Sequence, residues 1–176
     1  MRESGLRMAL TLLIIGVICG GLIAAVNGVT APVIEERTMV QFLEALEGFF
    51  PEVDSYDVSE IGNESFYTCT DAAGNFIGVV AQAKADGYGG AIFYDLAVSD
   101  SGDIVGIRIS SHGETPGIGD VITKDEFQDR VIGLNVADSI SAGVDVDTVS
   151  GATISSGGML DSIRRVMDII GENFLN

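Results

Sequence analysis

The strongest constraint on how this chain folds is an uncharged run of residues near its N-terminus, at positions 8–34. The densest apolar part, residues 8–26, is 19 residues long. As an α-helix it would span about 28 Å, close to the hydrocarbon thickness of a bilayer. A cleaved signal peptide is the alternative, but the run is longer than the apolar region of a signal peptide, and no A-x-A cleavage triplet follows it. The sequence therefore predicts a single transmembrane anchor that stays on the protein.

The charges that flank the anchor predict its orientation. Arg2 and Arg7 precede it, whereas Glu35 and Glu36 outweigh Arg37 directly after it. Because basic residues are retained on the cytoplasmic side of a membrane helix, the N-terminus is expected in the cytoplasm and the rest of the chain outside it. We therefore expect a single-pass protein of the cell membrane with an extracytoplasmic C-terminal domain.

Apolar residues recur at helical spacing beyond the anchor. The pattern continues past Pro32 and predicts an amphipathic helix that leaves the membrane, with the proline near its first turn. Its apolar positions are Val33, Ile34, Met39, Val40, Phe42, Leu43 and Leu46. The expected division is a cytoplasmic N-terminus and anchor at residues 1–34, an amphipathic helix and connector at 35–64, and the extracytoplasmic domain at 65–176.

Composition excludes several classes of function. The formal net charge of −17 argues against a nucleic-acid partner, because phosphate backbones bind basic surfaces through counterion release. The chain has only two cysteines, Cys19 and Cys69, and one histidine, His112. These counts exclude a disulfide-stapled scaffold, a Cys-rich zinc or iron–sulfur site and a multi-histidine cage, so no metal site is expected.

Two β-hairpins are predicted in the domain. The first joins residues 65–70 to 76–83 through the turn-rich stretch DAAGN, and the second joins 91–99 to 104–110 through DSGD. In the last of these strands Ile104, Gly106, Arg108 and Ser110 alternate with Val105, Ile107 and Ile109. This alternation predicts that one face of the strand is buried.

Two helices complete the predicted domain. A polar helix is expected around residues 124–132, and an amphipathic helix closes the chain at 156–174. The predicted fold class is α+β: a single N-terminal transmembrane helix, followed by an antiparallel sheet with helices packed on it.

The loop before the closing helix has the sequence DTVSGAT, at residues 147–153. Its small residues and Gly151 let the backbone approach a ligand closely. Thr153 lies near the start of a helix, whose free N–H groups and positive dipole end favour a phosphate. The alternative is that Ser155 or Ser156 simply caps the helix, and on physical grounds alone the cap is the better interpretation.

A second loop, SHGETPGIG at residues 111–119, lies between the second hairpin and the polar helix. Its glycines and proline predict a defined turn. His112, Glu114 and Thr115 carry polar groups that could bind a ligand, although a lone histidine in a loop is more often only exposed to solvent. A third glycine-rich piece, GYGG at 87–90, opens the second hairpin.

The order GYGG, hairpin, SHGETPGIG and DTVSGAT resembles the G subunits of Rnf electron-transport complexes (RnfG, also called RsxG). The NqrC subunits of sodium-pumping quinone reductases have similar loops, and DTVSGAT resembles their flavinylation motif. The resemblance implies that a separate flavin transferase esterifies Thr153 Oγ1 with the phosphate of FMN. It also implies that the flavin ring reaches toward the second loop. The motif further contains Asp147, which would assist the transferase or fix the loop, together with Ser150, Gly151 and Ala152.

For the second loop the resemblance suggests polar contacts to the flavin edges from Glu114 and Thr115, with His112 as an orienting neighbour. The implied function is an electron-relay subunit of a membrane complex. That complex couples ferredoxin oxidation, usually with NAD reduction, to sodium or proton translocation. Implied partners are the other subunits of the complex, the flavin transferase and membrane lipid.

No complete activity is expected of this chain alone, and no catalytic residue is predicted in it. The sequence has no Rossmann fingerprint and no iron–sulfur ligand set. The chain would therefore carry one redox cofactor of the complex and would not itself translocate ions. Three alternatives stay open at this point. They are an NqrC-type subunit, an FMN domain of an unrelated protein, and a membrane-anchored binding domain without redox function.

Overall fold

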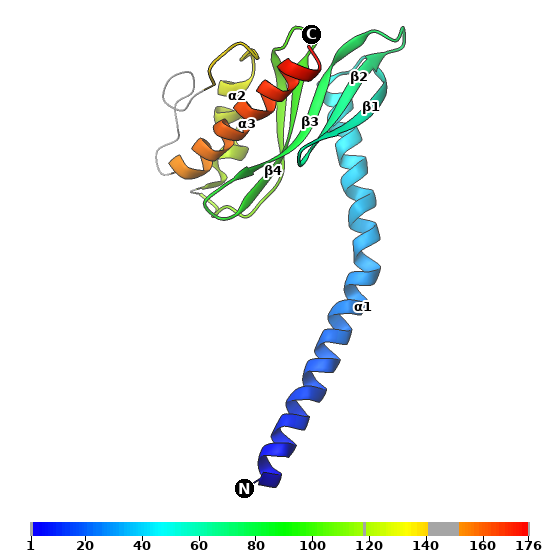
Figure 1. The fold of residues 1–176 in the computed structure, drawn as a ribbon, viewed down its shortest axis with the longest axis vertical. Helices are drawn as coiled ribbons and strands as arrows, with labels where there is room; N and C mark the ends of the chain where they lie inside the picture. The colour runs from blue at the N-terminus through cyan, green and yellow to red at the C-terminus, as the bar shows by residue number, and fades with distance from the viewer. Residues whose placement is uncertain (1, 118, 141–151, 176) are drawn as a thin grey trace. The chain divides into compact units, whose positions relative to one another are not determined.

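The computed structural model describes residues 2–117, 119–140 and 152–175. The chain divides into two compact units, Met1–Glu44 and Ala45–Asn176. The first unit is helical, and the second contains a five-stranded sheet with its helices (Figure 1). The predicted α+β class, with an apolar N-terminal helix before an antiparallel sheet, is confirmed.

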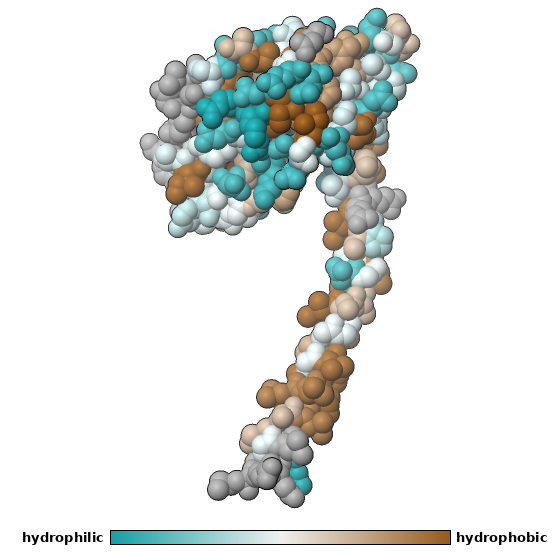
Figure 2. All heavy atoms as spheres, viewed as in Figure 1, coloured by the Kyte–Doolittle hydropathy of each residue, from teal (hydrophilic) through white to brown (hydrophobic). Residues whose placement is uncertain are grey.

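Helix α1 (Arg2–Phe49) is one continuous helix that contains Pro32. A helix over the predicted positions 33–46 is confirmed, but the prediction that it begins near Pro32 is wrong, because it continues the helix of the anchor without a break. A proline inside a helix removes a single N–H bond, and apolar membrane-type helices often tolerate this loss. Within α1 the stretch Arg7–Phe49 is long and apolar enough, by length and composition, to cross a membrane. Figure 2 shows hydrophobic side chains around the part of α1 nearer the N-terminus. The exposed hydrophobic residues of α1 include Leu12, Ile23 and Val29.

The second unit is built on an antiparallel sheet in which each strand pairs with the next one along the chain. The strands are β1 (Val53–Ile61), β2 (Glu64–Asp71), β3 (Phe76–Asp86), β4 (Ala91–Ser99) and β5 (Ile104–His112). The two predicted hairpins are β2–β3 and β4–β5. Strand β1 was not predicted, because it lies at the edge of the sheet and most of its side chains are exposed and polar.

The alternation predicted for β5 is interrupted near its start. Val98 of β4 pairs with Ile104, and Ala97 pairs with Gly106, so Val105 is an extra residue in the ladder. Such a bulge turns the following residues relative to the preceding ones. As a result Ile104 and Ile107 are both buried, whereas Val105 is exposed, and a strict period of two does not hold here.

The described residues after the sheet contain the helical segments η1 (Gly119–Thr123), α2 (Asp125–Val131) and α3 (Thr153–Asn173). Helix α2 confirms the predicted polar helix, and α3 confirms the closing helix. Helix α3 lies across one face of the sheet (Figure 1). It packs a stripe of buried side chains there, namely Met159, Leu160, Ile163, Val166, Met167 and Ile170.

Helix α3 begins at Thr153, three residues before the predicted start at 156. Thr153, the residue predicted to carry the flavin, is therefore the first residue of the helix itself. This placement decides which backbone groups surround the Thr153 hydroxyl.

Candidate functional site

A pocket of about 460 Å³ opens where three separate segments meet at one end of the sheet. These segments are the β3–β4 turn, the loop after β5 and the first turn of α3. The pocket volume lies within the range of about 300–1,000 Å³ that is typical of ligand sites. Its lining residues are Tyr88, Glu114, Thr115, Gly119, Ala152, Thr153, Ile154 and Ser155.

The pocket thus brings together the described parts of all three glycine-rich motifs. Thr153 is exposed and lines the pocket beside Glu114 and Thr115, which come from a loop about 40 positions earlier in the chain. Ala152 is buried at the helix start. Three further predicted site residues, Asp147, Ser150 and Gly151, lie outside the described residues.

The N-terminus of α3 has no side-chain cap from its own N-cap residue. That residue is Ala152, whose methyl group cannot accept a hydrogen bond. The interpretation that Ser155 or Ser156 caps the helix is wrong, because both lie inside the first turn and are buried. Ser156 Oγ donates to the carbonyl oxygen of Ala152 at 2.9 Å. The first turn also carries no acidic residue, so nothing in it offsets the positive end of the helix dipole.

Ser155 has a different role, which the sequence did not indicate. Its Oγ accepts a hydrogen bond of 3.4 Å from the backbone N–H of Tyr88. This bond links the first turn of α3 to the GYGG turn, 67 positions away in the chain.

Glu114 is a buried carboxylate in the wall of the pocket. Its Oε1 accepts a hydrogen bond of 3.0 Å from the N–H of Gly89. A Cβ atom at Gly119 would overlap Oε2 of the same carboxylate, so a side chain at that position would displace the carboxylate from its place in the wall. Glu114 therefore connects the β3–β4 turn to the loop after β5 and also presents a carboxylate to the pocket.

His112 and Thr115 flank Glu114 in the chain. His112 is the last residue of β5 and is exposed, and its Nδ1 accepts a hydrogen bond of 3.2 Å from the N–H of Glu114. The lining of the pocket includes Thr115 but not His112. The histidine thus contacts the loop that forms the wall rather than the pocket itself.

Close backbone packing positions the start of α3. A Cβ atom at Gly158 would overlap the carbonyl oxygen of Asp86, the last residue of β3. The helix can lie this close to the strand only because position 158 has no side chain. This contact sets where the first turn, and with it Thr153, lies relative to the GYGG turn.

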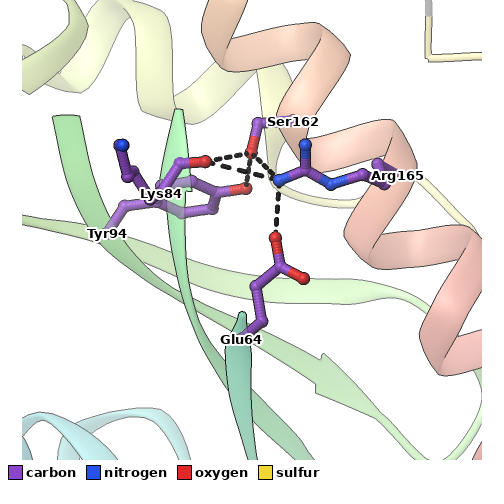
Figure 3. Close-up of polar contacts among 5 residues, drawn as sticks. All are labelled: Glu64, Lys84, Tyr94, Ser162 and Arg165. Atoms are coloured by element: carbon purple, nitrogen blue, oxygen red, sulfur yellow. Dashed lines mark hydrogen bonds and ion pairs between the residues drawn. The ribbon is translucent and has the colours of Figure 1, made fainter. Parts of the chain in front are cut away.

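Polar contacts further along α3 hold the helix on the sheet (Figure 3). Ser162 Oγ shares a hydrogen bond of 2.8 Å with the hydroxyl of Tyr94 and donates to the carbonyl oxygen of Lys84 at 3.0 Å. Arg165 forms an ion pair of 2.6 Å with Glu64 and also contacts Ser162 Oγ. The cluster connects α3 to β2, β3 and β4.

Two buried groups away from the pocket are held in their neutral forms. Burial raises the pKa of the Tyr94 hydroxyl well above its ordinary value of 10.0. Burial also raises the pKa of the Cys69 thiol to about 11. A thiol that stays protonated at neutral pH is a poor nucleophile, so Cys69 acts as a small apolar side chain.

Comparison with known proteins agrees with this geometry. The family model described as FMN-binding domain matches residues 87–168, which include every residue that lines the pocket. A second model, the RnfG N-terminal region, matches residues 1–47. The G subunit of the ion-translocating oxidoreductase complex of Methanosarcina acetivorans is 30% identical over 175 residues, and the match covers 93% of each chain. This chain belongs to the RnfG family.

A second G subunit is less similar to this chain. The G subunit of the proton-translocating ferredoxin:NAD(+) oxidoreductase complex of Clostridium ljungdahlii is 26% identical, and the match covers 86% of this chain and 83% of that one. Among solved structures, NqrC of Shewanella oneidensis shares the fold, with a TM-score of 0.52 at 23% identity. The match covers 65% of this chain and spans 64% of the length of NqrC.

Membership in the RnfG family makes this chain a subunit of an oxidoreductase complex with an FMN-binding domain at residues 87–168. The described residues of that domain fit a flavin nucleotide in chemical type. The pocket combines the Thr153 hydroxyl, at a helix start that its N-cap residue does not cap, with the Glu114 carboxylate. It also contains two further aliphatic hydroxyls and two large side chains, from Thr115, Ser155, Tyr88 and Ile154.

Proposed function

We propose that this RnfG-family chain carries FMN covalently, through a phosphoester bond between Thr153 Oγ1 and the flavin phosphate. The observation that carries the proposal is the position of Thr153. It is exposed, it is the first residue of α3, and it lines the pocket within the FMN-binding domain. A separate flavin transferase would form the bond, so the acceptor hydroxyl has to be accessible to another protein.

The start of α3 suits an attached phosphate for two reasons. Helix N-termini present free backbone N–H groups and a partial positive charge, which bind phosphates. In addition, neither Ala152 nor the rest of the first turn supplies a competing carboxylate. The remaining residues of the DTVSGAT motif, Asp147, Ser150 and Gly151, would shape the loop that the transferase recognises.

We assign the wall residues to the flavin ring. Thr115 would contact a polar edge of the ring through its hydroxyl, and Glu114 through the carboxylate that also binds Gly89 N–H. His112 would orient Glu114 through the hydrogen bond between its Nδ1 and the N–H of that residue. Bound flavin supplies electron transfer, and the protein supplies its position and electrostatic surroundings.

We further propose that the chain relays electrons within a membrane complex that couples ferredoxin oxidation, usually with NAD reduction, to sodium or proton translocation. Support comes from the relatives, which are named as G subunits of ion-translocating and of ferredoxin:NAD(+) oxidoreductase complexes. Partners would be the other subunits of that complex, the flavin transferase and membrane lipid. Residues 1–34 would anchor the chain with its N-terminus in the cytoplasm, as Arg2 and Arg7 indicate. The extracytoplasmic domain would begin earlier than the predicted residue 65, because β1 (Val53–Ile61) is part of its sheet and the compact unit spans Ala45–Asn176.

The attachment is tested by intact-mass measurement of the full chain produced in a host that contains a flavin transferase. We expect the wild-type mass to exceed that of the bare polypeptide by the mass of one FMN phosphoester, and Thr153→Ala to lose this addition. The matched control is Thr123→Ala, which removes a threonine hydroxyl from η1 outside the pocket lining and should keep the flavin. A wild-type chain with the bare mass would refute the proposal.

The relay is tested in the assembled complex in its native membrane. Thr153→Ala should leave the chain inserted and assembled but slow ferredoxin-driven electron flow, whereas Thr123→Ala should not. Unchanged turnover in Thr153→Ala would place the flavin outside the main electron path. For the orientation, a reporter fused after Asn176 should be active outside the cytoplasm, and activity inside would contradict it.

A further inference from the structure

Tyr88 combines a fixed backbone with an exposed ring. Its turn is held by three hydrogen bonds, of which Gly87 N–H to Gly90 carbonyl oxygen is the shortest, at 2.8 Å. The others run from Tyr88 N–H to Ser155 Oγ, at 3.4 Å, and from Gly89 N–H to Glu114 Oε1, at 3.0 Å. The side chain itself is 75% exposed, although it lines the pocket.

Exposure of one aromatic ring is common on protein surfaces and carries no argument by itself. The position of this ring does carry one. Tyr88 and Ile154 come from different segments, both are large and exposed, and both line the same pocket as the Thr153 hydroxyl. Two of the three hydrogen bonds that hold the turn are accepted by Ser155 and Glu114, which line that pocket as well.

The charge of the pocket wall differs between the start of α3 and Glu114. The start of α3 suits the anionic end of a nucleotide, whereas the buried carboxylate of Glu114 disfavours an anion beside it. An aromatic ring in the pocket lining suits the flat, largely apolar end of the same ligand, because offset stacking of aromatic rings is favourable. A tyrosine on a fixed backbone loses only two side-chain torsions when it packs in this way.

We propose that Tyr88 forms an aromatic wall of the flavin pocket: its ring packs against the isoalloxazine system of the FMN attached at Thr153 and shields one face of it from water. This inference rests on the proposed function and adds a residue to it. The hydrogen bonds to Ser155 and Glu114 position the tyrosine, so the attachment site and the aromatic wall are held by the same contacts.

The test uses the flavinylated full chain in detergent, with Tyr88→Ala, Tyr88→Phe and a control, Phe93→Ala. Phe93 is also an exposed aromatic residue, at 48%, but it lies on β4 and does not line the pocket. Two quantities are measured: the fluorescence lifetimes of the flavin and the quenching of its emission by iodide. A tyrosine in contact with flavin quenches the emission by electron transfer, whereas phenylalanine covers the ring without doing so.

In Tyr88→Ala we expect the ratio of short-lived to long-lived emission to fall about two- to tenfold, the change that corresponds to losing one stacking contact. Iodide quenching should increase in the same variant. Tyr88→Phe should keep the protection from iodide but lengthen the lifetime, and Phe93→Ala should match the wild type. If Tyr88→Ala carries no flavin, Tyr88→Leu replaces it in the same comparison.

Wild-type behaviour of the Ala or Leu variant in both measurements would overturn the aromatic wall and leave the flavin attachment intact. A wild-type chain without flavin in the mass measurement would instead refute the proposed function. The two failures are therefore distinguishable.

Discussion

The first turn of α3 and the rest of that helix are built in different ways. In the first turn Thr153 and Ile154 are exposed, and the N-cap residue offers no side-chain oxygen. From Met159 onward the apolar side chains that face the sheet are at most 1% exposed, and Ser162 and Arg165 add polar contacts to three strands. The buried part of α3 thus holds the helix on the sheet, whereas Thr153 and Ile154 in the first turn stay exposed and accessible to a ligand.

This difference implies that stability and flavin attachment can be changed separately. Variants in the buried part should lower the free energy of unfolding, whereas variants at Thr153 and Ile154, the exposed residues of the first turn, should affect attachment alone. The tests compare two residues of the same type in α3 that differ in their burial or in their contact with the sheet.

The largest effect is expected from Ile163→Ala. Ile163 is fully buried between α3 and the sheet, so the change leaves a cavity and should lower the free energy of unfolding by about 2–5 kcal/mol. Ile154→Ala, in the exposed first turn, should change it by less than about 0.5 kcal/mol. Urea unfolding followed by circular dichroism gives both values. Equal losses of unfolding free energy in the two variants would contradict the proposed difference between the buried part of α3 and its first turn.

An intermediate effect is expected from adjacent glycines. Alanine favours a helix over glycine by about 1 kcal/mol, and no atom of the described residues lies within 4 Å of a Cβ atom at Gly157, so Gly157→Ala should stabilise the unit. At Gly158 the Cβ atom would overlap the carbonyl oxygen of Asp86, which is backbone and cannot rotate away. Gly158→Ala should therefore destabilise the unit by about 1–3 kcal/mol.

The same glycine pair also reports on the site. Because the Gly158 contact sets where α3 begins relative to the GYGG turn, Gly158→Ala should reduce the fraction of chains that carry flavin, and Gly157→Ala should not. Intact-mass measurement after expression with the transferase gives this fraction. Full flavin occupancy in Gly158→Ala would show that attachment does not depend on this packing.

The glycine pair illustrates what the sequence could and could not predict. Local patterns predicted both hairpins, α2 and α3, because alternation, turn residues and helical spacing involve only neighbouring positions. The edge strand β1 was missed since its side chains are mostly exposed and polar, and the bulge at Val105 was missed because a bulge depends on the partner strand.

For the site, the motifs were predicted but their mutual contacts were not. From the sequence, Gly158 cannot be distinguished from any other glycine in a helix. Only the structure shows that the carbonyl oxygen of Asp86 lies beside it. Likewise Ser155 resembled a cap, and its bond to the N–H of Tyr88 depends on a turn 67 positions away. Such contacts are set by tertiary packing, which a single sequence does not encode in any local pattern.

The smallest effect is expected from Tyr94→Phe, which breaks one bond of the cluster around Ser162. Near pH 8 the loss should be about 1 kcal/mol, because Ser162 Oγ keeps its bond to the carbonyl oxygen of Lys84.

Burial raises the pKa of Tyr94 in the folded protein above its ordinary value of 10.0. The unfolded chain therefore releases this proton at lower pH than the folded one, and the tyrosine's contribution to stability is present below about pH 10 and lost as the pH rises further. Phenylalanine has no such proton, so the difference between wild type and Tyr94→Phe should narrow between about pH 9 and pH 11, around the tyrosine's ordinary titration range. Urea unfolding at several pH values checks this, and parallel curves throughout would show that Tyr94 is not held neutral by its burial under α3.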